Sequence, residues 1–148
     1  MAGFGGGRKS ILPGIAGYET IQANHNLLLK PESKNTFGSG KLKGNPIHED
    51  MMEACQMVKP TYLLNVVMGS SGKVAKVVGG KWDTAWEAGC KAVEENFGIE
   101  LSNKGDLVIA SAGGCPKDMN LYQSSKALDN AFYATKENGT IILLTESR

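Results

Sequence analysis

The chain has 148 residues, of which 41% are hydrophobic, and this length suits one ordinary domain with a buried core. Lysine and arginine total 16 against 15 acidic residues, so the net charge of +1 gives no overall field that favours nucleic acid or an anionic membrane. The 19 glycines gather at turns and loops without a repeat, which excludes collagen-like and low-complexity chains.

The cysteines indicate the compartment. Cys55, Cys90 and Cys115 stand apart without CxxC spacing, so neither a zinc site, an iron–sulfur site nor a disulfide is favoured. The sequence shows no apolar targeting segment and no run of about 18 apolar residues. We therefore expect a cytoplasmic location, with no membrane partner and no nucleic acid partner.

Two helices are predicted in the first sixty residues. The first spans Tyr18 to Leu29, because apolar positions recur along one face, and Pro31 ends it. Asn45 and Pro46 are typical of the N-cap and first helical positions, and they predict a second helix that ends near Val58.

A hairpin and a third helix follow. The apolar runs 62–68 and 74–78 are rich in β-formers, so they predict two strands joined by a turn at residues 69–72. Gly79-Gly80 is expected to end the second strand. Asp83 is the predicted N-cap of a helix from Thr84 to Asn96. The side chains expected to be buried on it are Trp86, Cys90, Val93 and Phe97.

Strand, glycine loop, helix and strand succeed one another over residues 106–144, which predicts a parallel βαβ unit. Asp118 is the expected N-cap of its helix, Met119 to Lys136, and Asn138-Gly139 is the turn before the last strand. Ligands bind at the carboxyl ends of parallel strands, so loop 112–118 is a candidate site. The predicted class is α/β, a mixed sheet with a β-hairpin in the first half and a parallel βαβ unit in the second.

The glycine-rich start is the other candidate site. Gly3, Gly5, Gly6 and Gly7 precede two cations, Arg8 and Lys9, and a backbone without Cβ atoms can turn its N–H groups toward an anion. The stretch departs from a Walker A motif, because Arg8 occupies the place of the second glycine. It predicts a phosphate or anion cradle, and a loose tail is the alternative.

Few other side chains could carry chemistry. Lys9 is either a covalent or electrostatic anchor or an ordinary surface lysine. His25 lies on the apolar face of its predicted helix, whereas His48 follows a helix start among acids and is expected to be exposed. Tyr122 and Lys126 share a helix face four residues apart, with Gln123 beside them, and could receive a carboxylate.

Four blocks of this sequence resemble the nickel-dependent lactate racemase family, in the family's order and at about its spacing. They cover nearly the whole chain. The blocks are Ala2–Ile21 with Asn24-His25, Gly44–Glu49, Asn65–Val67 and Ser111–Lys126.

The resemblance implies a cofactor, the nickel-pincer nucleotide (nickel pyridinium-3,5-bisthiocarboxylic acid mononucleotide). Lys9 matches the family lysine that attaches it covalently through a thioamide. His25, sixteen residues later, matches the nickel ligand. Gly5, Gly6 and Gly7 would help to hold the phosphate of the nucleotide.

The resemblance also implies the reaction, which is racemisation of lactate or a related small 2-hydroxy acid. The family transfers a hydride reversibly through a 2-keto acid, and Tyr122, Gln123 and Lys126 match residues that line its catalytic site. The family's two histidine bases and an arginine lie upstream of the cofactor lysine, and His48 matches neither base.

These matches lead us to expect an internal piece of a racemase that needs the remainder of its chain and is inactive alone. Residues 1–100 would form the second half of an N-terminal cofactor-binding domain, and residues 101–148 the start of a C-terminal α/β domain. Two alternatives stay open from the residues themselves. One is a non-catalytic module that binds a nucleotide or phosphate, and the other is a structural domain without a ligand.

Overall fold

The computed structural model describes residues 2–33, 35–69 and 72–147. They form two units, residues 1–98 and residues 99–148, each with its own helices and strands. The turn predicted at residues 69–72 includes Ser70 and Ser71, which lie outside the described residues.

The first two α-helices of unit one are α1 and α2. Helix α1 spans Tyr18–Asn26 and continues as a 3-10 turn over Leu27–Leu29. Helix α2 spans Pro46–Val58, and its N-cap Asn45 accepts a hydrogen bond from the His48 amide at 3.4 Å. Both predicted helices are confirmed, and in α2 proline and an N-capping side chain act within one turn of chain.

Helix α2 packs against the glycine-rich start of the chain. Strand β1 (Ala2–Gly3) pairs in parallel with β2 (Gly38–Ser39), and the 3-10 helix η1 (Gly7–Ser10) follows. The chain start is therefore part of the fold, which excludes the loose tail. The fully buried core beside it comprises Ala2, Leu12, Ile47 and Met51.

The predicted hairpin is confirmed as an antiparallel pair, β3 (Leu63–Met68) and β4 (Val74–Gly80). Strand β4 was expected to stop at Val78, before Gly79-Gly80, but it includes both glycines, which pair with Leu64 and Leu63. Backbone pairing needs no side chain, and the Tyr62 hydroxyl lies 2.7 Å from where a Gly79 Cβ would be.

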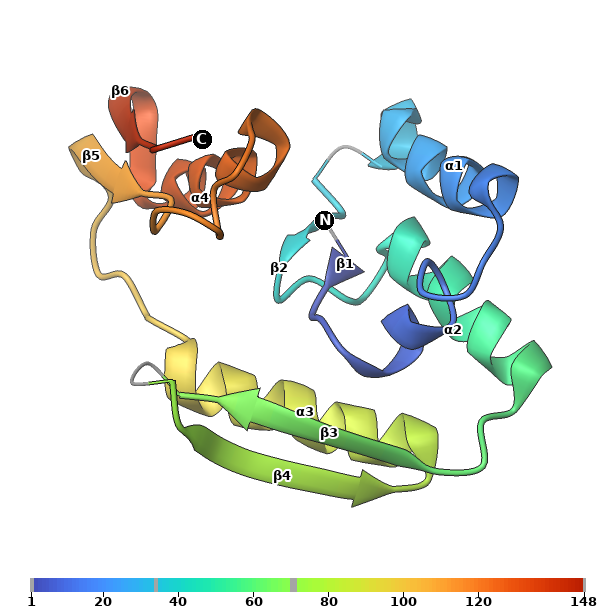
Figure 1. Ribbon diagram of the computed structural model, residues 1–148. Helices are drawn as coiled ribbons and strands as arrows, with labels where there is room; N and C mark the ends of the chain where they lie inside the picture. The colour runs from blue at the N-terminus through green and yellow to red at the C-terminus, as the bar shows by residue number, and fades with distance from the viewer. Residues whose placement is uncertain (1, 34, 70–71, 148) are drawn as a thin grey trace. The chain divides into compact units, whose positions relative to one another are not determined.

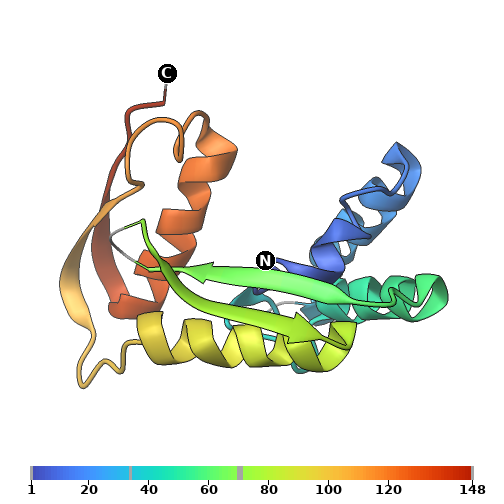
Figure 2. The same ribbon diagram turned by 60° about the horizontal axis from the view of Figure 1, so that its bottom comes forward.

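Helix α3 (Trp82–Phe97) lies along this hairpin, as Figure 1 and Figure 2 both show. Asp83 is not its N-cap, because the Lys81 carbonyl already accepts the Ala85 amide at 2.9 Å and starts the helix earlier. The Asp83 carboxylate instead accepts the Thr84 amide inside the first turn. Trp86 and Cys90 are buried as expected, but Phe97 is 46% exposed.

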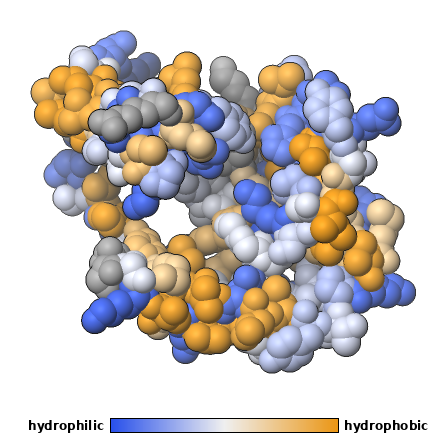
Figure 3. Space-filling view, in the orientation of Figure 1, coloured by the Kyte–Doolittle hydropathy of each residue, from blue (hydrophilic) through white to orange (hydrophobic). Residues whose placement is uncertain are grey.

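The outer face of the hairpin is apolar. Because side chains alternate across a strand, Val67 and Val78 face α3 and their neighbours face outward. Figure 3 shows apolar side chains gathered along the hairpin. The exposed ones are Tyr62, Leu64, Val66, Met68, Val74 and Val77.

Unit two is the predicted parallel βαβ unit: β5 (Gly105–Ser111), α4 (Leu121–Ala134) and β6 (Thr135–Leu144). Three details differ from the prediction. Asn120, not Asp118, is the N-cap of α4, with its Oδ1 accepting the Gln123 amide at 3.0 Å. The helix ends at Ala134, so it is shorter at both ends. Asn138, with φ of 63°, lies inside β6, where the register with β5 shifts.

The α/β class is thus confirmed, with the strands of the described residues arranged as three separate pairs. Within the described part of the chain, no helix is long and apolar enough to cross a membrane.

The core of unit one supplies a stability test. Met51 is 1% exposed and Met57, on the same helix, is 74% exposed. Met51→Ala should lower the free energy of unfolding by about 2–5 kcal/mol, because it leaves a cavity beside Leu12 and Ile47. Met57→Ala should change it by less than about 0.5 kcal/mol. Urea unfolding followed by circular dichroism measures both, and equal effects would contradict this core.

Candidate functional site

The glycine loop adopts a conformation that only glycine suits. Gly6 and Gly7 have φ of 62° and 49°, in the left-handed region. A Cβ on Gly7 would overlap the Trp86 ring, and one on Gly6 would lie 3.1 Å from Asn65 Oδ1. The Gly7 amide donates to that Asn65 oxygen at 2.9 Å. Gly7 is therefore buried in the protein interior, whereas Gly5 and Gly6 are exposed.

Arg8 points inward. Its guanidinium is 1% exposed, donates to the carbonyl oxygens of Ala2 and Phe4, and lies 4.2 Å from the centroid of the Trp86 ring. The Trp86 indole in turn donates to the Gly5 carbonyl at 3.1 Å. The expectation that both cations of this stretch would neutralise a bound anion is therefore wrong for Arg8, since its charge is used inside the fold.

Three ionisable groups share this interior. Desolvation lowers the pKa of Arg8 to about 10, which leaves it charged at neutral pH. Burial raises the pKa of Cys90 to about 11 and also raises that of Cys55. These two thiols are therefore protonated at neutral pH and are poor nucleophiles.

His48 is not exposed as expected. It is half-buried, and its ring stacks on Trp86 with a centroid distance of 5.4 Å. Burial, with a further contribution from the nearby Arg8 charge, lowers the pKa of His48 to about 4. Its Nδ1 is buried without a hydrogen-bond partner among the described residues. This neutral ring belongs to the packing around Arg8.

Lys9 follows Arg8 within η1 and is half-buried. Its amide donates to the Gly6 carbonyl at 3.1 Å, and its carbonyl accepts the Gly14 amide at 2.9 Å. The backbone that carries this side chain is therefore fixed on both sides.

His25 lies on α1 and is half-buried. Its Nδ1 is 2.8 Å from the Ile21 carbonyl, and because a carbonyl can only accept, Nδ1 must carry the hydrogen. The neutral ring then has an unprotonated Nε2, the form in which histidine binds metals. The neighbouring Asn24 fixes the helix, since its buried Nδ2 donates to Asp50 Oδ2 at 2.8 Å and to the Ile47 carbonyl.

In unit two the three predicted residues lie together at the start of α4. Lys126 Nζ donates to Gln123 Oε1 at 2.5 Å and lies 5.7 Å from the centroid of the Tyr122 ring. Tyr122 is 52% exposed. A lysine has three donors, so this ammonium can still bind a carboxylate. On the same helix Ala131 is buried, whereas Leu121 is 75% exposed.

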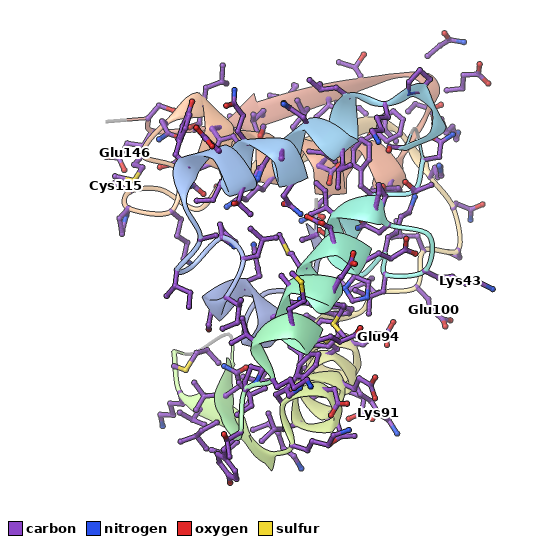
Figure 4. The ribbon with its side chains drawn as sticks, turned by 90° about the vertical axis from the view of Figure 1, so that its right-hand side faces the viewer. Lys43, Lys91, Glu94, Glu100, Cys115 and Glu146 are labelled. Atoms are coloured by element: carbon purple, nitrogen blue, oxygen red, sulfur yellow. The ribbon has the colours of Figure 1, made fainter. Side chains whose placement is uncertain are left out.

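Loop 112–118, which precedes α4, is held by residues that follow β6. The buried Asp118 accepts the Glu146 amide at 2.8 Å through Oδ2, and its carbonyl accepts from the buried Ser124 hydroxyl. The Cys115 amide donates to the Glu146 carboxylate at 2.9 Å, and Figure 4 shows these two side chains together. Asp118 therefore joins β6 to α4, which explains why it does not cap the helix.

The structure thus places the predicted residues in two groups. Gly5, Gly6, Gly7, Lys9 and His25 belong to unit one, whereas Tyr122, Gln123 and Lys126 belong to unit two. In the described residues, no cluster of three or more His, Cys, Asp or Glu side chains could bind a metal ion. A metal held by His25 would need further ligands from a bound group.

Sequence reasoning missed Asn65 and Trp86 as supports of the glycine loop. Both carried a signal. Asn65 interrupts an apolar strand, and a polar side chain there needs a hydrogen-bond partner. Trp86 was expected on a buried helix face, where its indole N–H needs an acceptor.

Comparison with known proteins agrees with this arrangement. The family model of the lactate racemase N-terminal domain matches residues 1–36, and that of the lactate racemase C-terminal domain matches residues 101–148. Lactate racemase from Lactiplantibacillus plantarum is 38% identical over the whole chain, and that from Thermoanaerobacterium thermosaccharolyticum is 42% identical over 99% of it. The chain spans 34% of the length of each.

The fold is shared with a solved structure. The lactate racemase apoprotein from Thermoanaerobacterium thermosaccharolyticum superposes with a TM-score of 0.88 at 40% identity, over 99% of this chain and 34% of that one. Fold and sequence together place the chain in the α/β class to which that apoprotein belongs. The chain belongs to the lactate racemase family.

The glycine loop gives a matched pair of variants. Gly7→Ala should lower the free energy of unfolding by about 1–3 kcal/mol, because it adds strain at positive φ and a clash with Trp86. Gly5→Ala should change it by less than about 0.5 kcal/mol, since its Cβ would meet nothing within 4 Å. Thermal and urea unfolding measure both, and a tolerant Gly7 would contradict this loop conformation.

His48 predicts a pH dependence of stability. Its pKa is about 4 when folded and near the ordinary 6.5 when unfolded, so the unfolded chain binds the proton first as pH falls. The contribution of neutral His48 to the free energy of unfolding should be fully present above pH 6.5 and should be lost progressively toward pH 4. His48→Phe keeps a ring beside Trp86 but cannot titrate, so its stability should decline less between pH 6.5 and about 5. Urea midpoints across this range test the difference, and parallel curves would refute it.

Proposed function

We propose that the protein carrying this chain racemises a small 2-hydroxy acid of the lactate type, and that unit one carries its nickel-pincer nucleotide. The observation behind this proposal is the state of His25. Its Nδ1–H is donated to the Ile21 carbonyl, so Nε2 is the unprotonated nitrogen of the neutral ring, at the position where the family has a nickel ligand.

The remaining features of unit one fit the same group. Lys9, at the position of the family's thioamide lysine, sits on a backbone fixed by the Gly6 and Gly14 bonds. Gly5 and Gly6 are exposed and can approach a phosphate closely. Gly7 shapes the loop from inside, because its amide is already bonded to Asn65.

Unit two would hold the substrate carboxylate through Lys126 and Tyr122. Gln123 would orient the Lys126 ammonium through their short hydrogen bond. When bound, the nickel-pincer nucleotide would accept and return the α-hydride, so that the substrate passes through a planar 2-keto acid. Residues 1–100 and 101–148 would then be the cofactor-binding and C-terminal portions of the racemase.

His48 does not serve as a base in this proposal. An efficient base at neutral pH has a pKa near 7, whereas that of His48 is about 4 and its ring packs on Trp86. The bases are therefore expected from histidines of the family type outside these residues.

A module that binds only nucleotide or phosphate has less support. That alternative relies on the glycine loop alone to hold the anion, and one of its amides, that of Gly7, is buried and already bonded to Asn65.

Mass spectrometry of the full-length protein, made in cells that synthesise the cofactor, tests the proposal. We expect an adduct on Lys9 and about one bound nickel. Lys9→Arg keeps the positive charge but cannot form a thioamide, so it should lose the adduct, whereas Lys43→Arg, at an exposed lysine, should keep it. His25→Gln should lose nickel. A wild-type protein without an adduct under these conditions would refute the tether.

A further inference from the structure

The glycine loop is held by side chains that are distant in sequence. Asn65 on β3 accepts the Gly7 amide at 2.9 Å, across 58 residues of chain. Trp86 on α3 donates to the Gly5 carbonyl at 3.1 Å, across 81 residues. The hairpin and α3 thus supply one acceptor and one donor to consecutive parts of the same loop.

These contacts leave the loop little freedom. Trp86 fills the space where a Gly7 side chain would project, and its ring also covers the Arg8 guanidinium. Arg8 binds the carbonyls of Ala2 and Phe4, so the loop is also tied back to β1. Every residue from Ala2 to Arg8 except Gly3 and Gly6 takes part in one of these bonds or ring contacts.

The fixed loop also fixes the backbone of Lys9, because the Lys9 amide is bonded to the Gly6 carbonyl. A group that attaches to Lys9 would otherwise have to order this glycine-rich segment, at a cost in backbone conformational entropy. Here folding has already met that cost, which is the condition for a preorganised site.

We propose that Asn65 and Trp86 are positioning residues that preform the glycine loop for attachment of the cofactor at Lys9. This inference rests on the proposed function for the identity of the group attached, but the loop clamp itself does not depend on it. Each acts through the backbone of the loop, Asn65 through the Gly7 amide and Trp86 through the Gly5 carbonyl.

Two variants of Asn65 separate positioning from simple packing. Asn65→Leu has a similar size but no acceptor for the Gly7 amide, whereas Asn65→Asp keeps an acceptor oxygen. In the cofactor-free full-length protein, hydrogen-exchange mass spectrometry should show the loop peptide exchanging about five- to tenfold faster in Asn65→Leu. Asn65→Asp should keep the slow exchange of the wild-type loop. Asn96→Leu is the matched control, because among the described residues the Asn96 side chain bonds within α3, to the Ala92 carbonyl.

The second readout is the extent of the Lys9 adduct in protein made with the cofactor-synthesis enzymes. We expect a loss of at least about fivefold in Asn65→Leu, recovery in Asn65→Asp and no change in Asn96→Leu. If Asn65→Leu does not fold, Trp86→Phe carries the same test, since it removes the bond to the Gly5 carbonyl and keeps a smaller ring over Arg8.

The outcomes are distinct. Faster exchange together with a reduced adduct supports the inference. A lower melting temperature with unchanged exchange and unchanged adduct overturns it, since that is what packing alone would give. An adduct missing from the wild-type protein refutes the proposed function, whereas the exchange data still decide whether Asn65 clamps the loop.

Discussion

The burial of one cation, Arg8, organises the first unit of this protein. A guanidinium removed from water is costly unless its charge is met by other groups. Here two backbone carbonyls and the face of Trp86 surround it, without a carboxylate among the described residues. Those carbonyls belong to Ala2 and Phe4, so satisfying the charge holds the start of the chain in place. The neutral state of His48 follows first from its own burial, and the charge of Arg8 lowers its pKa further.

The residues with proposed chemistry lie next to buried residues that anchor the backbone. Lys9 comes after the buried Arg8, and His25 comes after Asn24, which is 1% exposed and bonded to α2. In unit two, Tyr122 and Gln123 precede the buried Ser124, whose hydroxyl bonds to the Asp118 carbonyl and to Thr145. A reactive side chain gains a fixed origin from such a neighbour and still remains accessible, which meets the main structural demand on a preorganised site.

Unit two is held chiefly by polar contacts and strand pairing. Its buried side chains include Asp118, Ser124 and Thr135, whereas Leu107 and Ile109 are more than half exposed on the face of the sheet away from α4. Parallel sheets usually have both faces covered, but only one face of β5–β6 is covered by residues of its own unit. The same holds for the hairpin, where α3 covers one face and Leu64 and Val66 are exposed on the other.

The sequence by itself determined the elements whose causes are local. Asn45 and Pro46 determined the start of α2, two apolar runs rich in β-formers determined the hairpin, and strand–helix–strand order determined the parallel unit. Tertiary structure decided the direction of Arg8, the burial of His48 and the partner of Asp118. Each depends on groups far away in the chain: Trp86 lies 78 residues after Arg8, and Glu146 lies 28 residues after Asp118. A sequence pattern reports residue type and period, but whether a charged side chain faces water or the interior is decided by which distant groups can meet its hydrogen bonds.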